Sequence, residues 1–366
     1  MRIINLIRRG DPFPGSAFQT PLYRIPAVTI AGNRILVAFD VRADWRDLPA
    51  DFDIALVSSD DEGKSWSSPM VLRRHEPGHG FGDAALTYDP FTDRVFCWSV
   101  GSMGESYFSA VAGGAGLELW LSVSDDHGQT WSHRDLSELR PDGVAGMFTA
   151  SGTGTILPDG RLVQPFVARI NDEDYAVCAT SSDHGQTWTL GTPLGPGCDE
   201  SKVIALSNGE VLLHARSAPR RRSARSKDAG ANFTAPRVEE ALVDPGCNGG
   251  LVRIGDVFLA SMCSSPVERC RLSVHVSTDE GESWSEPIVV DEGAAAYSAL
   301  AALDENRVVL VWEADDYEAI LAAVISLDEL GVHREDGVTY WDSTRVTLSP
   351  RRGLGSAKPP IVNTTC

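Results

Sequence analysis

The sequence predicts an all-β fold, a six-bladed β-propeller that forms a single domain over residues 1–366. The first observation is an eight-residue motif, Ser-x-Asp-x-Gly-x-Thr/Ser-Trp, that recurs five times. The second is a short β-prone run before each copy, and the third is the spacing of the copies, which suits one blade of about four strands. At that spacing, 366 residues make six blades. The copies are Ser59–Trp66, Ser124–Trp131, Ser181–Trp188, Ser226–Phe233 and Ser277–Trp284.

The residue types within the motif favour a tight turn between two strands. Asp accepts hydrogen bonds from amides of its own turn, Gly supplies a positive φ, and Trp buries a large ring. A calcium loop is the alternative, because the carboxylates could bind Ca²⁺. Each copy is short, however, and lacks the spacing of an EF-hand. The fourth copy, SKDAGANF, has Phe233 where the others have Trp, and we expect a looser turn there.

Composition limits the class of partner. Hydrophobic residues make up 42% of the chain and charged residues 23%, as in an ordinary globular protein. No apolar run approaches the roughly 18–20 residues that cross a membrane. The net charge of −19 argues against nucleic acid, which is bound by basic surfaces. A site for an anionic substrate must therefore be densely cationic.

Shorter motifs bear on where the protein is located and on whether it binds a metal. The N-terminal stretch MRIINLIRRGDPFPGS does not resemble a signal peptide, so we expect a cytoplasmic protein, or a secreted one if an export signal precedes this sequence. Seven cysteines without a CxxC pair favour free thiols, with one or two disulfides as the alternative. HEPGH, from His75 to His79, matches the zinc motif HExxH, but Pro77 and Gly78 would break the required helix. We expect no metal, no other cofactor, no membrane attachment and a monomer.

Arg24 is the first candidate for chemistry, because it interrupts the apolar stretch LYRIPAV at 22–28. A buried arginine is costly unless it is paired or faces a ligand, and a structural salt bridge is the alternative. YRIP followed by several Asp-containing repeats resembles the exo-α-sialidases (neuraminidases) of bacterial and animal type. The resemblance runs from Leu22 to about Ala323. It implies a six-bladed propeller, in agreement with the blade count.

The resemblance also implies further site residues, each at a position that matches a family motif. These are Arg42 and Asp47 in RADWRD, Asp83 in GDAALTYD, Glu200 and Arg216 in the segment from DESK to HARS, Arg269 in VERCR, Tyr297 in YSAL and Glu313 in LVWE. Arg271 is the alternative to Arg269, and the resemblance favours Arg269. We take Met147 and Phe148 as candidates for the pocket that receives an N-acetyl group.

The implied roles suit the residue types. Arg24, Arg216 and Arg269 would hold the carboxylate of a sialoside through charge-assisted hydrogen bonds. Glu313 would hold Arg24 in place among these repelling cations. Arg42 and Asp83 would contact the C4 region of the sugar.

The reaction would use three other groups. An anomeric carbon that bears a carboxylate repels an anionic nucleophile, and sialidases are known to use a neutral tyrosine instead. Tyr297 would be this nucleophile and Glu200 its base. Asp47 would protonate the leaving oxygen and then activate water, which gives retention of configuration.

The sequence thus predicts a retaining exo-α-sialidase that hydrolyses terminal sialic acid from sialylated oligosaccharides or glycoconjugates. Two alternatives stay open. One is a trans-sialidase or an intramolecular sialidase on the same fold, and the other is a non-catalytic propeller that binds glycans. The joint presence of Asp47, Glu200 and Tyr297 speaks against the non-catalytic alternative.

Overall fold

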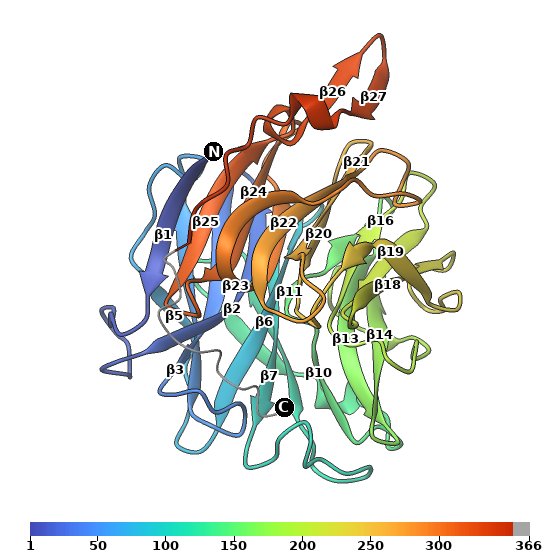
Figure 1. The fold of residues 1–366 in the computed structure, drawn as a ribbon. Coiled ribbons are helices and arrows are strands. Elements are labelled where there is room, and N and C mark those ends of the chain that lie inside the picture. Colours follow the sequence, from blue (N-terminus) through green and yellow to red (C-terminus); the bar gives the residue numbers. More distant parts are fainter. Residues whose placement is uncertain (354–366) are drawn as a thin grey trace.

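Six blades of mainly antiparallel strands surround a common axis, which confirms the all-β propeller prediction (Figure 1). The computed structural model describes residues 1–353. First strands of neighbouring blades contact one another at the centre, and the later strands of each blade follow toward the outside. The centre of the ring is therefore lined by strands from many parts of the sequence.

Blades 1 to 4 follow one another along the chain, and their strands run from the centre outward. Blade 1 contains β2 (Leu22–Ala31), β3 (Arg34–Arg42), β4 (Phe52–Ser59) and β5 (Met70–Arg73). Blade 2 contains β6 (Gly80–Asp89), β7 (Arg94–Ser102), β8 (Glu118–Ser124) and β9 (Ser132–Asp135), with β11 (Gly152–Thr153) parallel to β6. Blade 3 contains β10 (Gly146–Thr149), β12 (Thr155–Ile156), β13 (Leu162–Ile170), β14 (Glu173–Ser181) and β15 (Thr189–Leu190). Blade 4 contains β16 (Ser201–Ala205), β17 (Val211–Ala215), β18 (Arg220–Ser226) and β19 (Arg237–Val243).

Blades 5 and 6 share one long strand, β23 (Ile288–Ala302). Its first half pairs with blade 5, and its second half pairs with blade 6. Blade 5 also contains β20 (Gly250–Ile254), β21 (Val257–Cys263) and β22 (Cys270–Ser277). Blade 6 continues with β24 (Arg307–Ala314), β25 (Ala319–Ser326) and the N-terminal strand β1 (Arg2–Arg8). Pairing of β1 with β25 joins the two ends of the propeller and closes the ring.

A few short elements lie outside the blades. The hairpin of β26 (Val332–Glu335) and β27 (Val338–Trp341) projects from the propeller at the red end of Figure 1. Three single-turn 3₁₀ helices lie within residues 1–353 at Ser137–Leu139, Asp328–Leu330 and Ser343–Arg345. No helix in this part of the chain has the length and apolar character needed to span a bilayer.

The repeated motif occupies the turn between the third and fourth strands of blades 1 to 5. In the first copy, Asp61 accepts hydrogen bonds from the amide and hydroxyl of Ser65 at 2.8 and 2.6 Å. The Ser59 hydroxyl accepts from the amide of Gly63 at 2.8 Å, and both Glu62 and Gly63 have positive φ. Blade 6 has no such turn because its third strand, β25, and its fourth, β1, lie at opposite ends of the sequence. Six blades therefore carry five repeats.

The fourth copy keeps the Asp and Ser hydrogen bonds of the others, but Phe233 lacks the indole N–H that donates to the glycine carbonyl in the second and third copies. Asn232 takes the place of the Thr or Ser, and its amide and side-chain nitrogens both donate to Asp228 at 2.8 Å. Ser226 accepts from the Gly230 amide at 2.8 Å, as in the first copy. Phe233 packs against the hydrophobic cluster between blades 3 and 4. The side-chain amide therefore replaces the hydroxyl, and a smaller ring replaces the indole.

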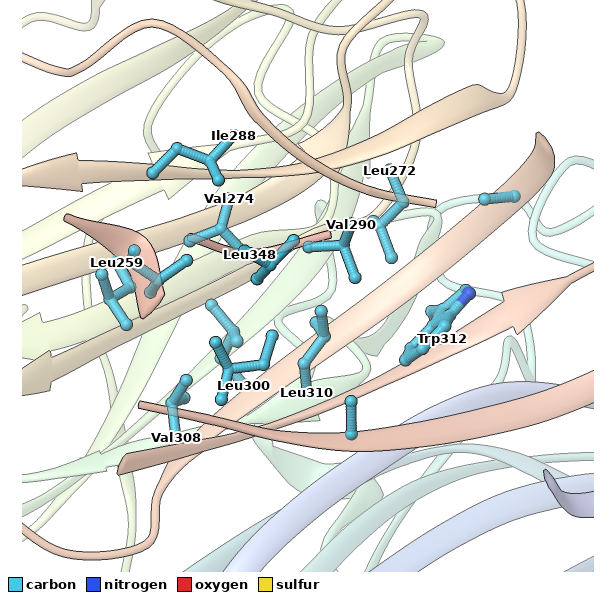
Figure 2. Packing of buried hydrophobic residues seen from close by; sticks show 14 of the residues in the cluster. Leu259, Leu272, Val274, Ile288, Val290, Leu300, Val308, Leu310, Trp312 and Leu348 are labelled. Atoms are coloured by element: carbon cyan, nitrogen blue, oxygen red, sulfur yellow. The ribbon is translucent and has the colours of Figure 1, made fainter. Parts of the chain in front are cut away.

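The core lies between neighbouring blades. Each inner strand is covered on both faces, so β24 reads as an almost continuous apolar run, VVLVW. Figure 2 shows side chains of blade 5, such as Leu259 and Val274, facing Leu300, Leu310 and Trp312 of blade 6. These inter-blade clusters fix the strands whose ends form the site.

Two expectations from short motifs can be compared with the structure. The six cysteines within residues 1–353 are free thiols, while Cys366 lies outside the described residues. HEPGH forms a tight turn in which the backbones of Glu76 and His79 bond to each other. His75 contacts Asp53 and His79 contacts Glu118, each at 2.7 Å, so the two imidazoles serve different partners.

Candidate active site

The sequence-predicted site residues lie at the rim opposite the repeated turns. In an antiparallel blade, the start of the first strand and the end of the second meet at the same edge. Arg24 lies near the start of β2, Arg42 at the end of β3, and Asp83 near the start of β6. Glu200 directly precedes β16, and Arg216 directly follows β17. Successive blades thus deliver these side chains to one rim.

Three arginines surround the ring of Tyr297. The guanidinium carbons of Arg24, Arg216 and Arg269 lie 5.6, 5.8 and 5.5 Å from the ring centroid. The structure therefore brings together residues from blades 1, 4 and 5 with the strand shared by blades 5 and 6. Arg271, the alternative to Arg269, is exposed. The cluster gives a chain of net charge −19 a concentrated cationic site, as an anionic ligand requires.

Glu200, Arg216 and Tyr297 form a hydrogen-bonded group. Nη1 of Arg216 donates to Oε2 of Glu200 at 2.6 Å and to the hydroxyl of Tyr297 at 2.8 Å. Burial alone would raise the pKa of Glu200, but Arg216, Lys202 and the hydrogen bond to Tyr297 lower it below its ordinary value. Burial raises the pKa of Tyr297 well above its ordinary value, against the opposing charge of Arg216. At neutral pH the group thus contains a carboxylate beside a protonated phenol.

Glu313 connects the Arg24 side chain to the backbone of Tyr297. It is completely buried, and its Oε1 accepts from Nε of Arg24 at 2.7 Å and from the amide of Ile25 at 2.8 Å. Its Oε2 accepts from the amide of Tyr297 at 3.1 Å. The carboxylate thereby holds the Arg24 side chain and the backbone of Tyr297 in one arrangement.

A second acidic group surrounds Arg42. Its Nη1 donates to Asp47 at 2.7 Å, and its Nη2 donates to Asp40 at 2.7 Å. Arg42 is buried, whereas the Asp47 side chain is 59% exposed. Burial and then the Asp40 carboxylate raise the pKa of Asp83 well above its ordinary value. The group combines one accessible carboxylate, Asp47, with buried charges that fix its position.

The family is identified by comparison with known proteins. A family model described as "BNR repeat-like domain" matches residues 43–310, which is most of the chain. A sialidase of Micromonospora viridifaciens is 31% identical over 322 residues, which cover 80% of this chain and 50% of that protein. The chain belongs to the sialidase family.

Other members of the sialidase family match over similar lengths. Sialidase-2 of Mus musculus is 27% identical over 354 residues, covering 84% of this chain and 93% of that protein. A solved structure, Hadza microbial sialidase Hz136, has a TM-score of 0.78 at 23% identity, covering 84% of this chain and 66% of that one. This likeness shows the fold. The chain spans about half the length of the Micromonospora sialidase.

In this sialidase-family chain, irregular inner strands aim the site residues. The pairing register shifts between Arg24 and Ala27 in β2, and between Ala295 and Ser298 in β23. Such bulges redirect side chains and leave amides outside the ladder. Ile25, in the first bulge, has φ +57°, a region that β-branched residues rarely adopt. Glu313 accepts hydrogen bonds from amides in both bulges, and so stabilises them.

The same arrangement recurs in β6, where the register shifts between Gly82 and Ala85. Asp83 has φ +56°, and its amide donates to Oδ1 of Asp40 at 3.0 Å. Asp40 thus binds Arg42 with one oxygen and the bulge with the other. A buried carboxylate on a neighbouring strand supports each site-forming bulge.

Sequence reasoning missed Tyr317. Its hydroxyl accepts from Nη1 of Arg269 at 2.9 Å, and its ring centroid lies 4.5 Å from the guanidinium carbon of Arg24. It lies in the tight turn between β24 and β25, where Asp315, Asp316 and Tyr317 all have positive φ. The polar run DDYE directly after an apolar strand was the available signal.

Two acidic residues were also missed. Asp40 lies two residues before Arg42, on the same face of β3, so the period of a strand could have revealed it. Asp199 directly precedes Glu200 and lies 3.2 Å from Nε of Arg216. Both place a carboxylate beside a site arginine.

The candidates for the N-acetyl pocket are only partly supported. Met147 is completely buried in the cluster between blades 2 and 3, so it cannot line an open pocket. Phe148 is partly exposed and stacks edge-on against Tyr107, with ring centroids 4.8 Å apart. Within residues 1–353, no cluster of three or more His, Cys, Asp or Glu is arranged to hold a metal ion.

Proposed function

We propose that this propeller is a retaining exo-α-sialidase with Tyr297 as its nucleophile. One observation carries the proposal: the Tyr297 hydroxyl shares the Nη1 atom of Arg216 with the Glu200 carboxylate, inside a ring of three arginines. A nucleophile, its base and an anion-binding cluster thus meet at one point. Family membership supports the same reaction.

The arginines account for recognition of a sugar carboxylate. Arg24 uses Nε for Glu313, so its two terminal nitrogens face away from that support and can form a bidentate pair with the ligand. Arg269 is held through Tyr317, and Arg216 through Asp199 and Glu200. Preorganised guanidiniums lose little freedom on binding, which favours a planar anion.

The first chemical step forms a bond between the Tyr297 oxygen and the anomeric carbon. Glu200 accepts the phenol proton as this bond forms, because its lowered pKa keeps it ionised beforehand. Asp47, which must be protonated when the substrate binds, donates its proton to the departing glycosidic oxygen and becomes a carboxylate. The products of this step are the free aglycone and a sialyl–tyrosine intermediate.

The second step regenerates the enzyme. Asp47, now a carboxylate, removes a proton from water as the water oxygen attacks the anomeric carbon. The bond to Tyr297 breaks, and its oxygen recovers the proton from Glu200. Two displacements at the same carbon give sialic acid of retained configuration.

We propose that Asp47 reaches both the leaving group and water because its side chain is more than half exposed. Arg42, which is buried between Asp40 and Asp47, holds Asp47 in place. Asp83 lies on the same side of the site, and we propose that Arg42 and Asp83 contact the C4 region of the sugar. The substrates would be sialylated oligosaccharides or glycoconjugates.

The test is hydrolysis of a fluorogenic α-sialoside by wild type, Tyr297→Phe and Asp47→Asn, with products identified by NMR. We expect free sialic acid, first released as the α-anomer, and severe loss of turnover in both variants at unchanged melting temperature. If the product were a sialylated acceptor or an anhydro sugar, the protein would be a trans-sialidase or an intramolecular sialidase and not a hydrolase. Sialoside binding without turnover by the wild type would leave the glycan-binding alternative.

A further inference from the structure

Lys202 lies beneath the proposed base and is almost completely buried, with 1% of its surface exposed. Its Nζ donates to the side-chain oxygen of Asn248 at 2.6 Å and to the carbonyl of Ser201 at 3.4 Å. Burying an ammonium group is costly unless it is well bonded, and both of these acceptors are neutral. A buried cation in this position therefore calls for an explanation beyond packing.

Asn248 connects Lys202 to Glu200. Its Nδ2 donates to Oε1 of Glu200 at 3.0 Å and to the hydroxyl of Ser151 at 2.8 Å. The Ser151 hydroxyl also donates to Oε1 at 3.1 Å. Oε2 of the same carboxylate binds Arg216. The two oxygens of Glu200 thus have separate partners, one set facing inward and one facing Tyr297.

We infer that Lys202 is a positioning residue for Glu200, acting by fixing the orientation of the Asn248 amide. The inference rests on the proposed function, in which Glu200 is the base. While Lys202 is protonated, its ammonium group only donates hydrogen bonds, so the oxygen of Asn248 must face it and the NH₂ group must face Glu200. The reversed amide would place NH₂ against ammonium and oxygen against carboxylate. Lys202 therefore keeps a donor on Oε1 and leaves Oε2 directed at Arg216 and Tyr297.

The chain provides space for this lysine. Gly152, on β11, has φ +116°, and a Cβ atom there would lie 2.6 Å from Cε of Lys202. Any larger residue would displace the lysine stem. Glycine at 152, in a backbone conformation that L side chains rarely adopt, therefore leaves the space in which the ammonium reaches Asn248.

The charge of Lys202 also affects titration. Burial lowers the pKa of Lys202 to about 7, and the positive charges of Arg221 and Arg216 act in the same direction. The negative charges of Glu200 and Asp199 raise the pKa and oppose this effect. In return, the Lys202 charge is one of the influences that lower the pKa of Glu200. Without this cation, Glu200 should hold its proton to higher pH and be less available as a base.

The test compares kcat and KM for a fluorogenic sialoside between pH 4 and 9 in wild type, Lys202→Met and Asn248→Asp. For Lys202→Met we expect kcat to fall about ten- to a hundredfold, with KM changed less than about twofold because the arginines are untouched. The acid limb of the pH profile should move up by about one pH unit. Lys227→Met, at a lysine whose side chain is 84% exposed, is the matched control and should behave as wild type.

Asn248→Asp separates positioning from folding. It keeps an acceptor for Lys202 but replaces the donor to Glu200 with an oxygen, so kcat should fall and the acid limb should again move up. If Lys202→Met does not fold, this variant still tests the Asn248 contact through which Lys202 would act. Wild-type kcat and an unchanged profile in folded Asn248→Asp would overturn the inference while leaving the proposed function intact. No sialoside hydrolysis by the wild type would instead remove the proposed function on which it rests.

Discussion

Glu313 offers the sharpest test of how the site is held together, through the substitution Glu313→Gln. Its two oxygens accept three hydrogen bonds, from Nε of Arg24 and from the amides of Ile25 and Tyr297. A glutamine has one acceptor oxygen. In either orientation, its NH₂ group faces at least one of these donors.

The expected loss follows from these contacts. Exchanging the carboxylate removes a charge-assisted hydrogen bond to Arg24, about 1.5–3 kcal/mol, and leaves one buried donor unsatisfied, about 1–3 kcal/mol more. Arg24 also becomes a buried cation without its ion pair, which typically costs about 3–5 kcal/mol in all. We take about 3–5 kcal/mol as the total, because these contributions overlap. For a chain of 366 residues this corresponds to about 4–6 °C in melting temperature.

Thermal and urea unfolding would measure the loss, together with KM for a sialoside. Glu318→Gln is the matched control, because Glu318 pairs with Arg9 at 3.1 Å on the surface. Surface pairs contribute about 0–1 kcal/mol, so the control should lower the melting temperature by about 1 °C or less. We also expect a higher KM for Glu313→Gln, since Arg24 is released. A loss no greater than that of the control would refute the account of Glu313 as the support for both bulges.

Three further predictions address binding, the turns and pH. Arg269→Leu should weaken binding of free sialic acid by about ten- to a hundredfold in calorimetry, since one charged partner is lost. Asn232→Ala should destabilise by about 1 kcal/mol in urea, because Asp228 loses its side-chain donor, whereas Asn33→Ala, at an exposed position, serves as the surface comparison. Hydrogen bonds from Ser65 lower the pKa of Asp61 to about 2, below the unfolded value, so this contribution to stability is complete above pH 4 and is lost as pH falls toward 2. Asp61→Asn should flatten the melting-temperature profile in that range.

The fold was largely predictable because its signal is repeated. Five copies of one turn motif mark five similar blades, and each copy forms the same bonds in the same place. The motif does not mark the sixth blade, because the outer strand of that blade comes from the N-terminus and no turn joins it to the third strand. Blade count therefore had to rest on length and spacing. In the fourth turn, the sequence reasoning considered only Phe233 and overlooked Asn232 as a substitute donor to Asp228.

The site was predictable only where family motifs carry it. Arg24, Glu200 and Tyr297 come from separate blades, and their spacing along the chain contains no geometric information. Lys202 was missed because it belongs to no motif or period, and Tyr317 because its only signal was a polar run after an apolar strand. A lysine followed by VIAL reads as a surface residue beside a strand, and only the position of Asn248 from the next blade shows why it is buried. Long-range partners of this kind cannot be read from local sequence.

The observed structural contacts and the proposed catalytic roles are divided unevenly among the acidic residues, which determines how mutants should be interpreted. Glu313 and Asp40 accept hydrogen bonds from backbone amides of the bulges as well as from arginines, so their loss disturbs the strands that carry Tyr297 and Asp83. Loss of activity in those variants would follow even if neither touched substrate. Asp47, by contrast, lies in an exposed loop, and its replacement leaves the bulges intact. If an Asp47 variant is inactive at an unchanged melting temperature, the result therefore supports a direct role of Asp47 in the reaction. The same loss of activity in a Glu313 variant would instead be explained by misplacement of Arg24.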